Sequence, residues 1–298
     1  MESPLHRAPT RVWRMTRSKV MRSPGMWLTL VILMAAAFAP VLAPYSPYHQ
    51  FSHGLTSSGM PLGSTPRFPL GTDAIGRDFL SRLLWGMRET LMISVPGGLL
   101  AIIIGTMVGV TAGYVGGLTD TALMRLTEVV LTIPPILMAG LLSVLLHPNT
   151  LDLILILGLV MWYVPARVVR TEVVLQRELA YVEAARAVGA SDARIMMVHV
   201  LPQIGGLLAV YMSTQIASIT TLTAGLSFVG IGIQPPTPSL GNLVASGSQW
   251  LGTAPRLALW PGLVLGIVVL AFTLLGEDVR RWLKSATEIP LPGGSGVQ

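Results

Sequence analysis

Six long apolar segments alternate with polar stretches along the chain. A helix needs about 20 mostly apolar residues to cross the hydrocarbon core of a bilayer. The segments that approach this length are 26–44, 91–115, 121–146, 151–169, 204–228 and 258–275. The pattern therefore predicts an all-α membrane protein with six transmembrane helices.

Two of these segments are not uniformly apolar. The third contains Pro134-Pro135, which predicts a kink because proline lacks an amide donor and clashes with the preceding turn. The fifth carries many hydroxyl and amide side chains, so it should face other helices or a wet pathway rather than lipid. From polarity alone, the candidate pathway-lining residues are Gln215, Ser218 and Thr221.

Composition supports a membrane location. Of 298 residues, 52% are hydrophobic and only 11% are charged, whereas a soluble domain is usually about a quarter charged. The absence of cysteine excludes disulfides, thiol catalysis and cysteine-bound zinc. The net charge of +6 does not indicate a nucleic-acid partner, because the basic residues sit at the ends of apolar segments.

The distribution of Lys and Arg predicts the orientation. With the N-terminal tail inside, inner segments hold 15 of these residues and outer segments hold 5, and cytoplasmic segments carry the excess in membrane proteins. Both termini are therefore expected in the cytoplasm. The first apolar segment is expected to stay as an anchor, because Pro44 follows the only candidate signal-cleavage point after Ala43.

The expected organisation has five parts. A cytoplasmic basic tail covers 1–25, the first transmembrane helix 26–44 and an extracytoplasmic loop 45–90. A permease domain covers 91–276 and contains a cytoplasmic loop at 170–203, and a cytoplasmic C-terminal tail covers 277–298.

Sequence motifs of catalysis and ATP binding are absent. The chain has no Gly-x-x-x-x-Gly-Lys-Ser/Thr, no His-Glu-x-x-His and no Gly-x-Ser-x-Gly. His49 and His53 stand four apart, but the prolines and glycine around them favour a loop over a metal site. Ionisable residues are scarce in the apolar segments, which disfavours an ion-coupled secondary carrier. Glu128 is the clearest one, and we expect it to pair with Arg125.

The loop at 170–203 predicts a helix–turn–helix. Residues 170–188 lack Gly and Pro, and Gly189 is well placed to end that helix. Ser191 can cap a second helix, which Pro202 ends or joins to the next span. Small residues at Ala184 and Ala185 allow another protein to approach closely. On this evidence alone, an ordinary amphipathic loop is an equal alternative.

The same loop resembles the EAA loop of bacterial ABC importer permeases. Six positions match at fixed spacing: Glu183, Ala184, Ala185, Gly189, Leu201 and Pro202. Residues 69–86 and 226–242 resemble segments of the C-type subunits of dipeptide, oligopeptide and nickel permeases. Departures are modest: Glu128 replaces the usual Asp, and the run at 275–281 differs from the usual Leu-Gly-Asp-Gly-Leu-Arg-Asp.

The resemblance implies a type I ABC importer permease bundle in the bacterial inner membrane. It implies a non-catalytic subunit that acts with a second homologous permease, two ATP-binding subunits and an extracytoplasmic solute-binding protein. ATP and Mg would bind to the ATPase partners, and no cofactor is expected in this chain. The loop around Glu183, with Ser191 included, would couple to an ATPase. The implied substrate is a peptide, with nickel, another small chelate or glutathione as alternatives.

Two further segments carry structural expectations. In 71–78, glycines alternate with acids that can cap turns, and Arg77 can pair with either acid. This segment is either a self-capped loop or an extracytoplasmic gate or binding-protein contact formed by Gly71, Thr72, Asp73, Gly76, Arg77 and Asp78. In 229–242, glycines and prolines interrupt an apolar context, which predicts a broken or re-entrant element.

Overall fold

The computed structural model describes residues 23–146 and 149–287, and it is helical throughout apart from loops and isolated β-bridges. Residues 1–22 of the expected N-terminal tail and residues 288–298 of the expected C-terminal tail lie outside the described residues. The helices are α2 (Pro24–Ala37), α3 (Ala39–Leu42), α4 (Phe79–Val115), α5 (Gly117–Thr132), α6 (Pro135–Leu146), α7 (Thr150–Met161), α8 (Tyr163–Arg177), α9 (Ala180–Ala187), α10 (Asp192–Arg194), the π-helix η2 (Ile195–Val200), α11 (Leu201–Phe228), α12 (Leu240–Ser248) and α13 (Arg256–Thr287).

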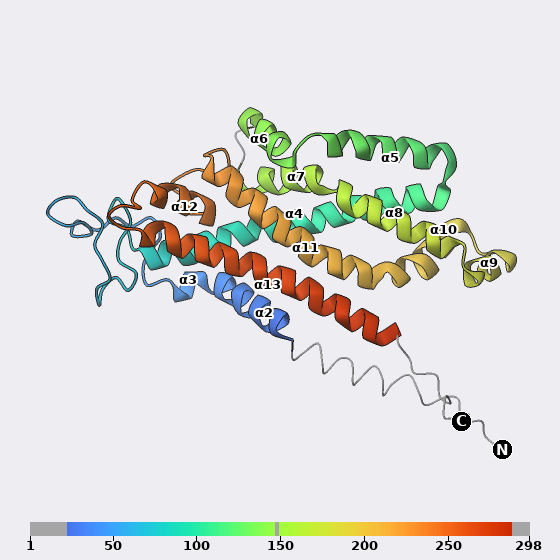
Figure 1. Ribbon diagram of the computed structural model, residues 1–298, viewed down its shortest axis with the longest axis horizontal. Helices are drawn as coiled ribbons and strands as arrows, with labels where there is room; N and C mark the ends of the chain where they lie inside the picture. The colour runs from blue at the N-terminus through green and yellow to red at the C-terminus, as the bar shows by residue number, and fades with distance from the viewer. Residues whose placement is uncertain (1–22, 147–148, 288–298) are drawn as a thin grey trace, which may run out of the picture.

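Three long helices, α4, α11 and α13, run along the length of the molecule (Figure 1). In the described residues, three helices are long and apolar enough to cross a membrane: Phe79–Val115, Asp192–Phe228 and Arg256–Lys284. Counting each of two bent helix pairs as one span raises the number to five. The expected six spans are therefore not confirmed, because the first apolar segment forms only the 14-residue helix α2.

The kink predicted at Pro134-Pro135 is confirmed. Helix α5 ends at Thr132, α6 begins at Pro135, and the two helices are bent by 82°. A second bend of 44° separates α7 from α8. Pro165 lies in the first turn of α8, where a missing amide donor costs least.

Helix boundaries differ from the expected ones at two places. Helix α4 begins at Phe79, so the last twelve residues of the expected loop 45–90 are helical. Charged residues such as Arg82 and Arg88 lower the hydropathy there, so the apolar pattern did not predict the start of the helix. Helix α13 continues to Thr287, so the start of the expected C-terminal tail, 277–287, is helical.

Close packing of α4 on α8 depends on three glycines spaced four apart. A Cβ atom on Gly105 would lie 2.6 Å from the Pro165 Cβ atom, and one on Gly109 would lie 2.5 Å from the Ala166 carbonyl oxygen. Gly113 meets the backbone of α8 in the same way. Glycine at these positions lets the two backbones approach each other, as in other membrane helix pairs.

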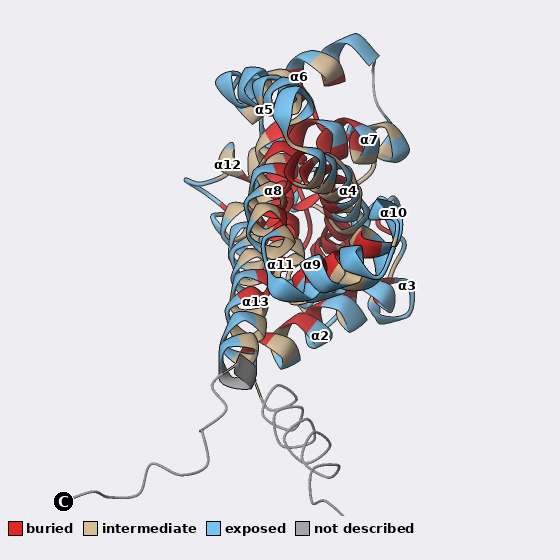
Figure 2. Ribbon diagram, turned by 90° about the vertical axis from the view of Figure 1, so that its right-hand side faces the viewer, coloured by how far each residue is buried: buried red, intermediate tan, exposed pale blue. Residues whose placement is uncertain are grey.

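The buried core lies between α4, α7, α8, α11 and α13, whereas α5 and α6 are mostly exposed (Figure 2). Leu157 and Ile219 are among its fully buried side chains. Thr127 is the one buried residue of α5, and Leu126, Val129 and other apolar side chains of α5 are exposed. In a bundle of this kind, such a face requires lipid or another protein.

The interruption predicted for 229–242 is confirmed. Helix α11 ends at Phe228, and the short helix α12 starts at Leu240 after an irregular segment. The Leu240 amide donates to the Thr90 hydroxyl at 3.1 Å. Gly241 contacts the backbone of α11 so closely that a Cβ atom would clash with the Ala224 oxygen.

Candidate functional site

The helix–turn–helix predicted in the loop at 170–203 is present, and we call residues 178–194 the elbow. Helix α9 ends before Gly189, whose φ of +84° is one that L side chains rarely adopt. The Gly189 amide donates to the Arg186 carbonyl at 3.0 Å, and the Ala190 amide donates to Ala185 at 3.1 Å. Ser191 then caps α10 by accepting the Arg194 amide at 3.4 Å.

One detail of the elbow differs from the expectation, and one expected alternative is confirmed. The helix expected over 170–188 is broken, because α8 ends at Arg177 and Leu179 is extended before α9 starts. The second helix continues through η2 into α11, so Pro202 joins it to the next span, which is one of the two expected outcomes. In η2 the Leu201 amide reaches back to Met196. This wider π-turn gives space to Pro202, which has no amide to donate.

The elbow is anchored by apolar residues and presents its motif to the outside. Val182 is buried with Ile195, Val200 and neighbouring residues of α8 and α11. Glu183, Ala184, Gly189 and Ser191 are exposed, and Ala185 is half-buried. Leu201 and Pro202 start α11 beyond η2. A groove of about 600 Å³ runs over the motif, lined by Tyr181, Ala184, Ala185, Val188, Gly189, Ala190, Arg194 and His199.

Polar contacts tie the elbow region to α4 and α5. The Tyr114 hydroxyl donates to Asp192 Oδ1 at 2.7 Å. Arg177 donates to the carbonyl oxygens of Gly113 and Tyr114 at 3.0 and 3.3 Å, so it satisfies the C-terminal end of α4. Arg170 binds Asp120 through two hydrogen bonds of 2.9 and 2.6 Å. Sequence reasoning missed these partners, because they lie 50 or more positions apart.

Two titratable groups of α9 are shifted by their surroundings. Partial burial raises the pKa of the Tyr181 phenol, and the nearby Glu172 carboxylate raises it further. A hydrogen bond to Tyr114 raises the pKa of the Arg186 guanidinium. Both directions keep these side chains, at neutral pH, in the state they have in water: Tyr181 neutral and Arg186 positively charged.

The candidate pathway residues of α11 have three different environments. Gln215 is only 3% exposed and donates to the Met161 carbonyl of α7 at 2.7 Å. Ser218 is half-buried and Thr221 is exposed. Thr214, four positions before Ser218, is also exposed, so the outward polar stripe of α11 runs through Thr214, Ser218 and Thr221.

The segment 71–78 folds as a self-capped loop. Asp73 accepts from Arg77 Nε at 2.7 Å and from the amides of Ile75 and Arg77 at 3.0 and 2.9 Å, and Arg82 Nε lies 3.2 Å away. Asp78 caps α4 by accepting the Ser81 amide at 2.7 Å. The Thr72 hydroxyl donates to the Gly54 carbonyl, and the left-handed turns at Gly71 and Gly76 have φ of 77° and 81°.

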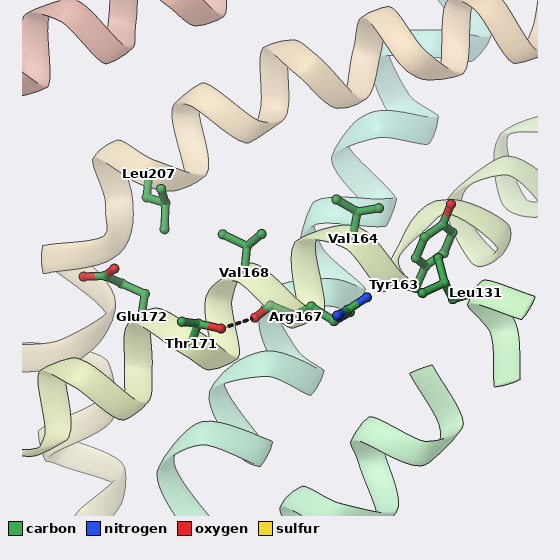
Figure 3. A pocket seen from close by; sticks show the side chains of 8 residues that line it. All are labelled: Leu131, Tyr163, Val164, Arg167, Val168, Thr171, Glu172 and Leu207. Carbon is green, nitrogen blue, oxygen red and sulfur yellow. Dashed lines mark hydrogen bonds between the residues drawn. The ribbon is translucent and has the colours of Figure 1, made fainter. Parts of the chain in front are cut away.

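A cavity of about 450 Å³ opens between α5, α8 and α11 (Figure 3). Most of its wall is apolar, and its polar side chains come from α8. It is lined by Leu131, Tyr163, Val164, Arg167, Val168, Thr171, Glu172 and Leu207. Arg167 and Glu172 point toward opposite ends of the cavity. Sequence analysis counted Arg167 only as a charge that sets the orientation.

Long apolar helices, two bent helix pairs and an exposed elbow define a polytopic helical membrane protein. Residues 105–288 match the family described as "Binding-protein-dependent transport system inner membrane component". Residues 10–56 match the "N-terminal TM domain of oligopeptide transport permease C". The chain therefore belongs to the inner-membrane permeases of binding-protein-dependent ABC importers, in their C-type branch.

Relatives cover most of the chain. A di/tripeptide transport system permease protein DppC from Pseudomonas aeruginosa is 35% identical over 86% of this chain and 85% of its own. A glutathione transport system permease protein GsiD from Pectobacterium atrosepticum is 32% identical over 92% and 90%. An oligopeptide transport system permease protein OppC from Haemophilus influenzae is 30% identical over 90% and 87%.

Proposed function

We propose that the chain is the C-type permease subunit of an ABC importer that carries short peptides inward. The observation that carries the proposal is the exposed Glu183–Gly189 motif, set on an elbow whose other side is anchored in the bundle. Relatives named for di/tripeptide, oligopeptide and glutathione transport support a substrate with peptide-like chemistry. Glutathione is the alternative substrate.

The elbow is the part that an ATPase subunit would grip. Two ATP-binding subunits would bind ATP and Mg and close on each other, and a cleft on one of them would hold α9. Hydrogen bonds from Tyr114 to Asp192 and from Arg170 to Asp120 would pass the movement to α4 and α5. The bundle would then switch from inward-facing to outward-facing.

The remaining partners fit the exposed parts of the chain. A second homologous permease would cover the exposed faces of α5 and α11, and the pathway would run between the two subunits past Ser218 and Thr221. The buried Gln215 would fix α11 in the wall of the pathway through its hydrogen bond to the Met161 carbonyl of α7. An extracytoplasmic binding protein would contact the loop that contains Asp73, and both termini would lie in the cytoplasm.

Reconstitution with the partner permease, the ATPases and the binding protein tests the proposal. We expect uptake of labelled dialanine into proteoliposomes only with ATP, and Glu183→Ala or Gly189→Val should lower uptake about tenfold or more, as loss of an interface anchor does. Glu277→Ala removes an exposed acid on α13, far from the elbow, and should leave uptake unchanged.

Two results would contradict the proposal. Uptake that continues without the ATPases, driven by an ion gradient, would indicate a secondary carrier. Equal uptake by the Glu183→Ala and Glu277→Ala complexes would remove the elbow from the coupling mechanism. A panel of dipeptides, longer peptides, glutathione and a nickel chelate then sets the substrate range.

A further inference from the structure

The cavity between α5, α8 and α11 contains two opposite charges and no others. Arg167 and Glu172 both come from α8, and the remaining lining residues are uncharged. An ionisable side chain that faces a cavity of a membrane transporter is a candidate for the substrate path. The pair therefore needs an explanation beyond packing.

The two charges do not satisfy each other. Five positions along a helix correspond to a rise of about 7.5 Å, and the side chains extend in opposite directions, Arg167 toward Tyr163 and Glu172 toward Leu207 (Figure 3). Within residues 23–146 and 149–287, the Arg167 guanidinium has no ion-pair or hydrogen-bond acceptor. Glu172 accepts one hydrogen bond, from the neutral Gln176 amide at 3.0 Å, so its negative charge has no cationic partner there.

We propose that this cavity is a subsite for the charged termini of short peptides, with Arg167 binding the α-carboxylate and Glu172 the α-ammonium group. The inference rests on the proposed function and specifies its substrate class. A guanidinium matches a carboxylate with two parallel hydrogen bonds. A carboxylate accepts the N–H donors of an ammonium group with the same charge assistance.

The spacing and the walls set the selectivity. An extended peptide spans at most about 3.3–3.6 Å per residue, so a dipeptide, with one hydrogen bond at each end, can bridge a separation of about 7.5 Å or more. Val168 lies between the two charged side chains in Figure 3, and Val164 and Leu207 are also apolar lining residues. They offer no hydrogen bond that would select one peptide side chain over another, so the cavity would recognise the two termini and tolerate many sequences.

The exposure of Arg167 and Glu172 to water keeps peptide binding weak, and weak binding lets the transported peptide leave the cavity. Arg167 is exposed and Glu172 is half-buried in an open cavity, and exposed ion pairs contribute little free energy because water screens them. A peptide would be oriented here and then leave toward the cytoplasm, rather than being trapped.

Charge reversal in the reconstituted complex tests the subsite with one probe, labelled dialanine. Arg167→Glu puts two carboxylates in the cavity and Glu172→Arg puts two guanidinium groups there, so each should lower ATP-driven uptake by about fivefold. The exchange Arg167→Glu with Glu172→Arg restores one charge of each sign. A zwitterion can turn around, so uptake should return to within about twofold of the unaltered complex.

The controls separate this inference from the proposed function. Arg125→Glu reverses the charge of an exposed arginine of α5 outside the cavity. Adding Glu172→Arg to this variant should not raise its uptake. The subsite would be overturned if the single charge reversals left uptake unchanged. It would also be overturned if uptake fell in the single variants and the double exchange did not restore it. That second result would assign Arg167 to a fixed anion such as a lipid phosphate. ATP-independent uptake in the unaltered complex would instead overturn the proposed function.

Discussion

Asp73 shows how one residue organises the loop before α4. Its carboxylate accepts hydrogen bonds from Arg77 Nε and from two backbone amides, and it forms an ion pair with Arg82. Arg82 is 5% exposed and also donates to the Pro47 carbonyl at 3.1 Å. A buried guanidinium is tolerated only when its charge is compensated. Asp73 provides that compensation.

Replacing Asp73 by alanine should therefore destabilise the protein. The substitution leaves Arg82 buried without its counter-charge, and removing one partner of a buried pair costs about 3–5 kcal/mol. We expect a clear fall in the Tm of the purified chain in detergent. Glu277→Gln, which disrupts an exposed pair with Arg280, should change Tm little. Equal Tm values for the two variants would refute the compensating role of Asp73.

Local residue roles were predictable, whereas distant partners were not. Gly189 as a helix stop, Ser191 as a cap and the pairing of Arg125 with Glu128 at 2.8 Å are all confirmed, because each depends on neighbours in sequence. Asp278 was noted only as part of a departure from the family pattern. In the structure it accepts the Gly25 amide at 3.0 Å and links α13 to α2. No local pattern encodes that contact.

At the scale of elements, the α4–α8 crossing should tolerate little added volume. Gly109→Val would place side-chain atoms against the Ala166 carbonyl, and overpacking costs about 1–3 kcal/mol or more. Lower Tm and lower yield are the expected results. Gly266→Ala is the matched control, since no atom lies within 4 Å of its added Cβ. Wild-type stability of Gly109→Val would contradict the close approach of these helices.

The link between α4 and the elbow makes a second prediction at this scale. Asp192→Ala removes the acceptor of the Tyr114 hydroxyl, so the elbow should move with less effect on α4. We expect ATP hydrolysis by the assembled complex to persist while peptide uptake per ATP falls about threefold, as loss of one charge-assisted hydrogen bond permits.

A matched control distinguishes this effect from simple loss of a polar group. Thr111→Val removes a hydroxyl near the same end of α4 that bonds only its own helix, at Met107. The ratio of uptake to hydrolysis should stay normal in that variant. A parallel loss of hydrolysis and uptake in Asp192→Ala would indicate a folding defect and would contradict the transmitting role.

Element type was more predictable than element limits. Pro134 and Pro135 correctly predicted the bend between α5 and α6, because the effect of proline on a helix is local. The start of α4 at Phe79 was missed because hydropathy penalises Arg82 and Arg88, although tertiary contacts stabilise both. The break between α8 and α9 was also missed, because no Gly or Pro marks it.

At the scale of the molecule, a long helical bundle has one exposed apolar surface and one protruding elbow. Many apolar residues of α5 and α6 are exposed in the single chain, and both helices are largely coloured as exposed in Figure 2. The elbow exposes Glu183, Gly189 and Val188. We propose that this elbow faces the cytoplasm and is held by an ATPase subunit. The bundle alone does not drive transport in this account.

Single-cysteine labelling tests that claim most directly, because the chain has no cysteine of its own. Val188 is 85% exposed at the end of α9, and Val188→Cys provides a probe on the elbow. A membrane-impermeant maleimide should label Val188→Cys in inside-out vesicles, and binding of the ATPase subunits should protect it. Labelling in intact spheroplasts, or labelling that the ATPase subunits do not reduce, would contradict the account.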